Sequence, residues 1–156
     1  MKSIVNILLE IDKRLDEYKN LNQVFTFNDI SKMAIKLLQD NTEIREEVKK
    51  NFKIIMIDEY QDTSDIQDEL VKLIANNNVY MVGDVKQSIY RFRNANPNIF
   101  RSRYNEYTKY SEALKDKEST VIDLLKNFRS RKEVVEDINQ IFSIVMSDKV
   151  GGADYK

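Results

Sequence analysis

Apolar and charged positions alternate at helical spacing in the first third of the chain. Over residues 4–18 the apolar side chains return every three or four positions, which predicts an amphipathic helix. The positions of this stripe are Ile4, Leu8, Ile11, Leu15 and Tyr18. A second helix is predicted to begin at Asn28, which would cap its first turn, and a short charged helix should follow over about residues 42–50.

The period then changes to short continuous apolar runs. Residues 54–57 form one such run, ending abruptly in Asp58-Glu59, and residues 79–82 another, ending in Gly83-Asp84. Runs that are apolar on both faces are typical of parallel strands covered on both sides. A third candidate strand, residues 121–125, is interrupted by Asp123.

Helix signals separate these predicted strands. Ser64 and Gln67 have the spacing of a capping box, and an apolar stripe follows them, so residues 54–82 are predicted to form a strand–helix–strand unit. Further helix starts are expected at Asn96, which precedes a proline, and at a second capping box. That box would consist of Ser130 and Glu133. The pattern therefore predicts an α/β fold of three layers, with a small parallel sheet of two or three strands flanked by helices.

Composition narrows the chemistry available to the chain. The 156 residues include no Cys and no His, which excludes thiol nucleophiles, Ser-His-Asp triads and structural zinc. Catalysis would have to use carboxylates, amides, Lys, Arg or Tyr, together with a metal that prefers oxygen ligands. The net charge of −1 gives no overall attraction to nucleic acid. Because neither a membrane-length apolar run nor a signal-peptide pattern occurs, a cytoplasmic location without membrane contact is expected.

Carboxylates and amides follow both predicted strands of the strand–helix–strand unit. The carboxyl ends of parallel strands are where α/β sheets bind ligands. One carboxylate there could hold Mg²⁺ while a neighbour orients or deprotonates a water. Alternatively, these acids only open the next helix, whose dipole favours negative charge. The residues concerned are Asp58, Glu59, Gln61, Asp62, Asp84 and Gln87.

A basic and aromatic segment follows the second predicted strand. Residues 85–104 contain five basic residues and no acidic one, with four aromatic side chains between them. Cations for phosphates and rings for bases predict a platform for single-stranded nucleic acid. The alternative is an ordinary surface helix with an apolar face, which we favour for Phe100 and Tyr104 but not for Tyr90 and Phe92. The basic residues are Lys86, Arg91, Arg93, Arg101 and Arg103.

Several of these segments resemble motifs of one family. Residues 54–63, IIMIDEYQDT, resemble motif II, the Walker B segment, of UvrD/Rep-like superfamily 1 DNA helicases. Residues 82–95, VGDVKQSIYRFRNA, are similar to motif III, and residues 125–130, LKNFRS, to motif IV. Residues 27–30 resemble the element that precedes motif II. The sequence of motif III is most similar to that of AddA-type helicase–nuclease subunits. The fold that the resemblance implies is part of a RecA-like P-loop NTPase domain.

The resemblance implies a role for each matching residue. Asp58 would bind the Mg²⁺ of Mg-ATP, and Glu59 would activate the hydrolytic water. Gln87 would sense the γ-phosphate and couple it to DNA. Arg129 would act as an arginine finger, stabilising charge during phosphoryl transfer. Phe128 stands where many relatives have a Tyr stacked on adenine.

The aromatic pair of motif III has an implied role as well. Tyr90 and Phe92 align with aromatic residues that stack on single-stranded bases. The neighbouring cations Lys86, Arg91 and Arg93 would then contact phosphates.

The chain departs from a complete helicase motor. No Gly-x-x-x-x-Gly-Lys-Ser/Thr sequence occurs, so the phosphate-cradling loop is missing. The chain is therefore expected to be a fragment of a helicase with three parts. These are the end of a helical insertion (1–24), the second half of the first RecA-like domain (25–112), and the opening strand and helix of the second RecA-like domain (113–156).

The implied parent couples ATP hydrolysis to DNA unwinding in double-strand-break repair and recombination. It would use ATP and Mg²⁺, act on single- and double-stranded DNA and work with a partner subunit. The excerpt itself is expected to be inactive, to bind no cofactor tightly and to be able to self-associate through an open sheet edge. The alternatives are a stand-alone single-strand-binding or decoy module and, with least support, a Mg²⁺-dependent phosphohydrolase using Asp58, Glu59 and Asp62.

Overall fold

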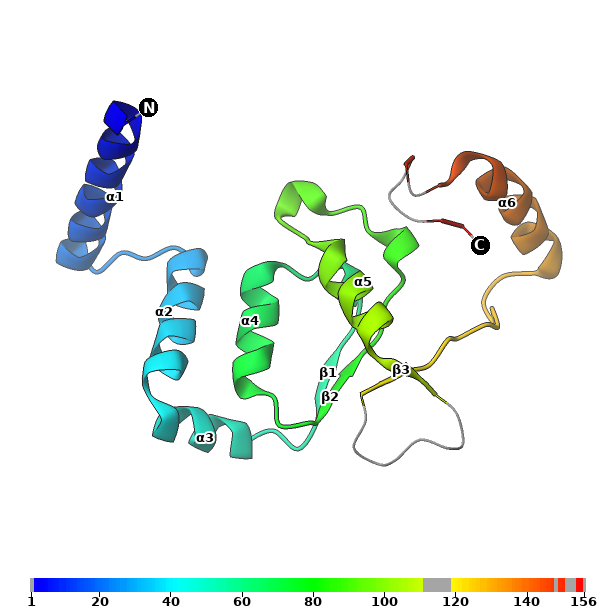
Figure 1. The fold of residues 1–156 in the computed structure, drawn as a ribbon, viewed down its shortest axis with the longest axis horizontal. Coiled ribbons are helices and arrows are strands. Elements are labelled where there is room, and N and C mark those ends of the chain that lie inside the picture. The colour runs from blue at the N-terminus through cyan, green and yellow to red at the C-terminus, as the bar shows by residue number, and fades with distance from the viewer. Residues whose placement is uncertain (1, 111–118, 148, 151–153, 156) are drawn as a thin grey trace.

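Three helices form the N-terminal part of the computed structural model, which describes residues 2–110, 119–147, 149–150 and 154–155 (Figure 1). They are α1 (Lys2–Asn22), α2 (Phe27–Asp40) and α3 (Thr42–Lys50), and all three were predicted. The predicted cap of α2 is wrong, because Thr26 and not Asn28 occupies the N-cap. The Thr26 Oγ1 accepts from the backbone N–H of Asp29 (3.2 Å), while Asp29 Oδ2 accepts from the Thr26 N–H (2.9 Å). This reciprocal pair starts the helix before Asn28 can cap it.

The predicted strand–helix–strand unit is confirmed. Strands β1 (Ile55–Ile57) and β2 (Val79–Met81) pair in parallel, and α4 (Asp65–Ile74) connects them. The capping box of α4 also forms as predicted. Ser64 Oγ accepts from the Gln67 N–H (3.4 Å), and Gln67 Oε1 accepts from the Ser64 N–H (2.9 Å).

Two helices, α4 and the later α5 (Pro97–Glu106), lie on one face of this sheet. Met56 and Tyr80 lie side by side in register and are 73% and 50% exposed, whereas Met81 on the opposite face is partly buried. On that covered face, Arg103 of α5 donates to Met81 Sδ and to Asp68 of α4. The described residues therefore form two layers here, and the predicted three-layer arrangement is wrong for them.

The third predicted strand is shorter than expected and pairs elsewhere. Strand β4 (Thr120–Val121) pairs in parallel with β3 (Thr108–Lys109) and forms a sheet separate from β1–β2. Residues 122–125 are not in a strand. The Asp123 carboxylate instead accepts from Lys109 Nζ (2.8 Å) and from Tyr104 Oη (2.9 Å), which ends the ladder.

The last helix, α6 (Lys132–Val145), begins without the predicted capping box. Its N-cap is Arg131, which makes no side-chain cap hydrogen bond. The Ser130 N–H donates to Asn127 Oδ1 (3.0 Å), because the preceding loop folds around that asparagine. The predicted boundary between residues 112 and 113 lies outside the described residues. In the part of the chain that the structure describes, no helix is both long and apolar enough to cross a bilayer.

The best-buried side chains gather where the chain leaves β1. Tyr60 and Gln61, in the 3₁₀ turn η1 (Tyr60–Asp62), are the largest side chains that are fully buried. The Tyr60 ring lies 6.0 Å, centroid to centroid, from the ring of Phe100 on α5. Phe100 thus packs against the core, which confirms its interpretation as part of an apolar helix face.

Candidate functional site

The acidic residues after β1 and β2 meet at one edge of the sheet, as the sequence predicted. The backbone ladder continues past both strands, because the Val82 N–H donates to the Ile57 carbonyl (2.9 Å) and the Tyr60 N–H donates to the Val82 carbonyl (2.8 Å). Asp58 and Glu59 therefore lie beside the turn at residues 83–84. This edge is the place where chemistry at strand ends can occur.

Glu59 has an unusual backbone conformation. Its φ of 49° and ψ of 43° lie in the left-handed region, which few residues other than glycine adopt. The Asp58 Oδ1 accepts from the Glu59 N–H (2.9 Å) and supports this turn. Such a conformation costs about 1–2 kcal/mol and persists where surrounding contacts enforce it. Both carboxylates are exposed at the edge.

Gln61 joins the two strand ends through its side chain. It is only 1% exposed. Its Nε2 donates to Glu59 Oε2 (2.7 Å), and its Oε1 accepts from the Asp84 N–H (3.0 Å). The sequence placed Gln61 at this edge but gave it no role.

Gly83 is required by the close approach of this amide. A Cβ atom at position 83 would lie 2.6 Å from Gln61 Oε1 and 3.1 Å from the Tyr60 nitrogen. Neither distance leaves room for a methyl group. A lone glycine next to a predicted strand end was the available sequence signal for this contact.

Asp84 organises the start of the loop after β2. Its Oδ1 accepts from the Lys86 N–H (3.0 Å) and caps the short turn η2 (Val85–Gln87). Its Oδ2 accepts from Gln87 Nε2 (3.2 Å), so the exposed Gln87 side chain is held at the same edge as Asp58 and Glu59.

The oxygen ligands at this edge fit Mg²⁺. Within the described ranges no three acidic side chains converge in the manner of an all-protein metal cage. Magnesium is usually held by one or two carboxylates with waters and substrate phosphates, so Asp58 alone is a suitable ligand. In the same turn Asp62 Oδ1 is buried without a hydrogen-bond partner among the described residues, which leaves further acceptor capacity here.

The aromatic pair of the basic segment is exposed and ordered by local contacts. The rings of Tyr90 and Phe92 lie 5.8 Å apart and are part of side chains that are 37% and 76% exposed. The Arg93 guanidinium lies over both rings, 5.3 and 5.5 Å from their centroids. The loop is anchored to η1, because the Asn96 N–H donates to the Thr63 carbonyl (2.9 Å). Stacking faces and cations therefore lie together on a supported loop.

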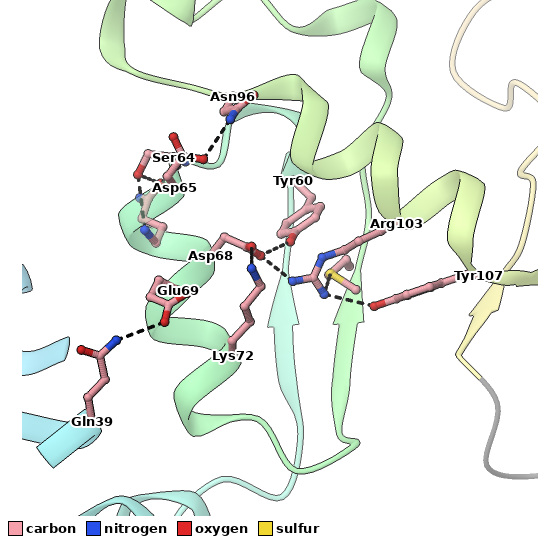
Figure 2. A network of polar contacts seen from close by, with 12 residues as sticks. Gln39, Tyr60, Ser64, Asp65, Asp68, Glu69, Lys72, Asn96, Arg103 and Tyr107 are labelled. Atoms are coloured by element: carbon pink, nitrogen blue, oxygen red, sulfur yellow. Dashed lines mark hydrogen bonds and ion pairs between the residues drawn. The ribbon is translucent and has the colours of Figure 1, made fainter. Parts of the chain in front are cut away.

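The five basic residues of this segment do not share one surface. Lys86, Arg91 and Arg93 are exposed, but Arg103 turns inward and pairs with the buried Asp68 of α4 (2.5 Å; Figure 2). The inclusion of Arg103 in a phosphate-binding run is thus wrong, because its charge is already neutralised in the core.

The ion network around Asp68 supports the site from behind. Tyr60 Oη and Lys72 Nζ both donate to this carboxylate, at 2.5 and 2.9 Å (Figure 2). Burial alone would raise the pKa of Asp68, but the hydrogen bonds from Tyr60 and Lys72 and the charge of Arg103 outweigh burial and lower it. Burial, and then the bond to Asp68, raises the pKa of Tyr60 well above its usual range.

The structure does not bring Phe128 and Arg129 to this edge. The stretch between β4 and α6, which carries both residues, leads away from the β1–β2 sheet (Figure 1). Both side chains are exposed, and the Arg129 N–H donates to Asn127 Oδ1 (2.9 Å). Their predicted roles at a nucleotide stay predictions.

Comparison with known proteins gives consistent matches. Residues 3–108 match the model of the UvrD/REP helicase N-terminal domain. The A subunit of the ATP-dependent helicase/nuclease of Clostridium beijerinckii is 39% identical over 99% of this chain and 13% of its own length. Proteins of the same name from Streptococcus pyogenes serotype M18 and Clostridium acetobutylicum are 39% and 38% identical, again over 99% of this chain. The chain spans about an eighth of the length of these relatives.

Proposed function

Because the chain belongs to the UvrD/REP helicase N-terminal domain family, we propose that it forms part of the motor of an ATP-dependent DNA helicase, of the same type as the helicase/nuclease relatives that it matches. The observation that carries this proposal is the shared sheet edge. It holds the carboxylates Asp58 and Glu59 beside Gln87, and the loop that leaves this edge presents the aromatic pair.

Each group at the edge has a proposed task in ATP hydrolysis. Asp58 holds the Mg²⁺ of Mg-ATP, which supplies charge neutralisation for the phosphates. Glu59 orients the attacking water and accepts its proton. Gln87 contacts the γ-phosphate. Arg129 and Phe128 reach the nucleotide when the segment before α6 moves toward the edge, Arg129 to stabilise charge and Phe128 to stack on the base.

Single-stranded DNA is the proposed partner of the loop after β2. Bases stack on Tyr90 and Phe92, while Lys86, Arg91 and Arg93 lie close enough in sequence to contact neighbouring phosphates. The same loop begins at Asp84, which holds Gln87, so DNA and nucleotide sites are a few residues apart.

The whole protein is proposed to unwind DNA in double-strand-break repair and recombination, together with a partner subunit. The 156 residues alone are proposed to be inactive, because Glu59 can activate water only against a phosphate that is held in place. The exposed face with Met56 and Tyr80 gives the chain a surface for self-association.

The test is ATP hydrolysis by the full-length protein with and without oligo-dT. The expected result is DNA-stimulated phosphate release that Glu59→Gln abolishes. Tyr90→Ala or Phe92→Ala should each weaken DNA binding about 5- to 150-fold, since stacking is worth roughly 1–3 kcal/mol per base. Hydrolysis that survives Glu59→Gln would contradict the proposal.

A stand-alone single-strand-binding role is the second candidate. It is favoured by the exposure of Tyr90 and Phe92 on a loop that the hydrogen bond from the Asn96 N–H to the Thr63 carbonyl anchors. Fluorescence anisotropy of labelled oligo-dT with the 156-residue chain tests it. Binding that resists Tyr90→Ala and Phe92→Ala but is lost in Arg91→Ala would indicate plain electrostatics and contradict a stacking platform.

A further inference from the structure

Gln61 occupies a position between the two strand ends that only a neutral amide can satisfy. Toward Glu59 it must donate, because a carboxylate only accepts (2.7 Å). Toward Asp84 it must accept, because the backbone N–H only donates (3.0 Å). Both demands are met by one side chain in one orientation.

The surroundings of Gln61 fix that orientation. The side chain is 1% exposed, so either group left unpaired would lack water as a substitute. Gln61 Oε1 lies only 2.6 Å from where a Cβ atom at position 83 would be, so the absence of a side chain at Gly83 makes room for it. Ser88 Oγ donates to the Gln61 carbonyl (3.4 Å) and adds a second tie to the loop after β2. The amide can therefore not turn away without disturbing both strand ends.

Glu59 depends on this contact more than an ordinary surface carboxylate would. Its left-handed backbone gives the side chain an uncommon direction, and the carboxylate is exposed to competing water. The buried Gln61 donor fixes one carboxylate oxygen, while the other has no hydrogen-bond partner in the described part of the chain.

We propose that Gln61 is the positioning residue that fixes the Glu59 carboxylate against the loop leading to the aromatic pair. This inference rests on the proposed function, because it assigns Glu59 to water activation. Asp84 connects the two parts, since its N–H binds Gln61 and its carboxylate holds Gln87. The orientation of the base is thereby set by the same loop that carries Tyr90 and Phe92.

Two substitutions separate the two bonds of Gln61. Gln61→Glu keeps an acceptor for the Asp84 N–H and, where its carboxyl is ionised, replaces the donor to Glu59 by a second carboxylate. Gln61→Met has similar length and removes both bonds. Gln67→Glu is the matched control, because Gln67 uses only its acceptor oxygen in the capping box, which a glutamate keeps.

The experiment uses the full-length protein and measures kcat and KM for ATP with oligo-dT present, the Kd for oligo-dT, and amide hydrogen exchange. Gln61→Glu should lower kcat about 10- to 100-fold, the range expected for a lost hydrogen bond to a charged group. KM for ATP, the Kd for oligo-dT and the protection of the Asp84 amide should stay within about twofold of wild type. Gln61→Met should lower kcat as well and accelerate exchange at Asp84. Gln67→Glu should resemble wild type in every measurement.

Three outcomes decide between the claims. A wild-type kcat in Gln61→Met would overturn the positioning role, while an inactive Glu59→Gln variant in the same series leaves the proposed function standing. Lost amide protection across α4 in Gln61→Glu would assign the residue to the fold and also overturn the role. Full activity of Glu59→Gln would overturn the proposed function and this inference with it.

Discussion

Removal of the Asp68 charge should destabilise the fold more than any surface charge change. Asp68 is 4% exposed and accepts hydrogen bonds from Tyr60, Lys72 and Arg103. The substitution Asp68→Asn keeps the size of the side chain but leaves the Arg103 guanidinium in the core without its counter-charge.

The magnitude follows from the exposure of the partners. Removing one member of a buried ion pair costs about 3–5 kcal/mol. Lys72 is 59% exposed and regains water, whereas Arg103 is 19% exposed and retains only neutral partners, Tyr107 Oη (3.1 Å) and Met81 Sδ (3.6 Å), among the described residues. A loss of about 2–4 kcal/mol is therefore expected, out of a typical 5–15 kcal/mol. At a urea m-value of about 2 kcal/mol/M, the unfolding midpoint should fall by about 1–2 M.

Urea unfolding followed by far-UV circular dichroism is the assay. Glu10→Gln is the control, because the pair of Glu10 with Arg14 on α1 is mostly exposed and should move the midpoint by no more than about 0.2 M. The double variant Asp68→Asn with Arg103→Met removes both charges, keeps an acceptor for Tyr60 and should recover at least about half of the loss. A midpoint for Asp68→Asn equal to that of the Glu10 control would refute the reasoning.

Three further predictions use the same chain. Stability should fall below pH 3.8, the ordinary pKa of an aspartate, because folding lowers the pKa of Asp68. It should also fall above pH 10.0, the ordinary pKa of a tyrosine, because folding raises the pKa of Tyr60. Unfolding free energies measured across this pH range should show a flatter alkaline limb for Tyr60→Phe than for wild type. Gly83→Ala should cost about 1–3 kcal/mol in urea unfolding, since its Cβ would displace Gln61, and an unchanged midpoint would contradict the close approach. The 156-residue chain should release no phosphate from ATP above the level of its Glu59→Gln variant, with or without oligo-dT, and release that the substitution removes would show a working site.

Local features of the fold could be predicted from the sequence because short-range spacing determines them. The capping box of Ser64 and Gln67 and the two strand ends needed only neighbours within a few residues. The prediction of where α2 starts was wrong, because Thr26 and Asn28 both have side chains that can cap a helix. Only the reciprocal bond between Thr26 and Asp29 decides between them.

Features that depend on distant residues could not be predicted. Arg103 lies in a run without acidic residues, and its partner Asp68 is 35 positions earlier, on another helix. The role of Gln61 likewise requires Glu59 and Asp84 to meet, which happens only when β1 and β2 pair. The predicted number of layers was wrong because apolar strand residues indicate that a sheet face can be covered but do not indicate which segment covers it.

The contact of Asp123 with Lys109 and Tyr104 sets a limit on movement in the C-terminal part of the chain. The hydrogen bonds from Lys109 and Tyr104 lower the pKa of Asp123, and the bond that Lys109 donates to Asp123 raises the pKa of Lys109, so the contact is charged at neutral pH. While this contact holds, Asp123 stays beside Lys109, and Arg129 follows Asp123 by six residues. A fully extended chain spans at most about 3.3–3.6 Å per residue, so the Cα atom of Arg129 stays within about 20–22 Å of the Cα atom of Asp123. A larger displacement of Arg129 requires the contact of Asp123 with Lys109 and Tyr104 to break.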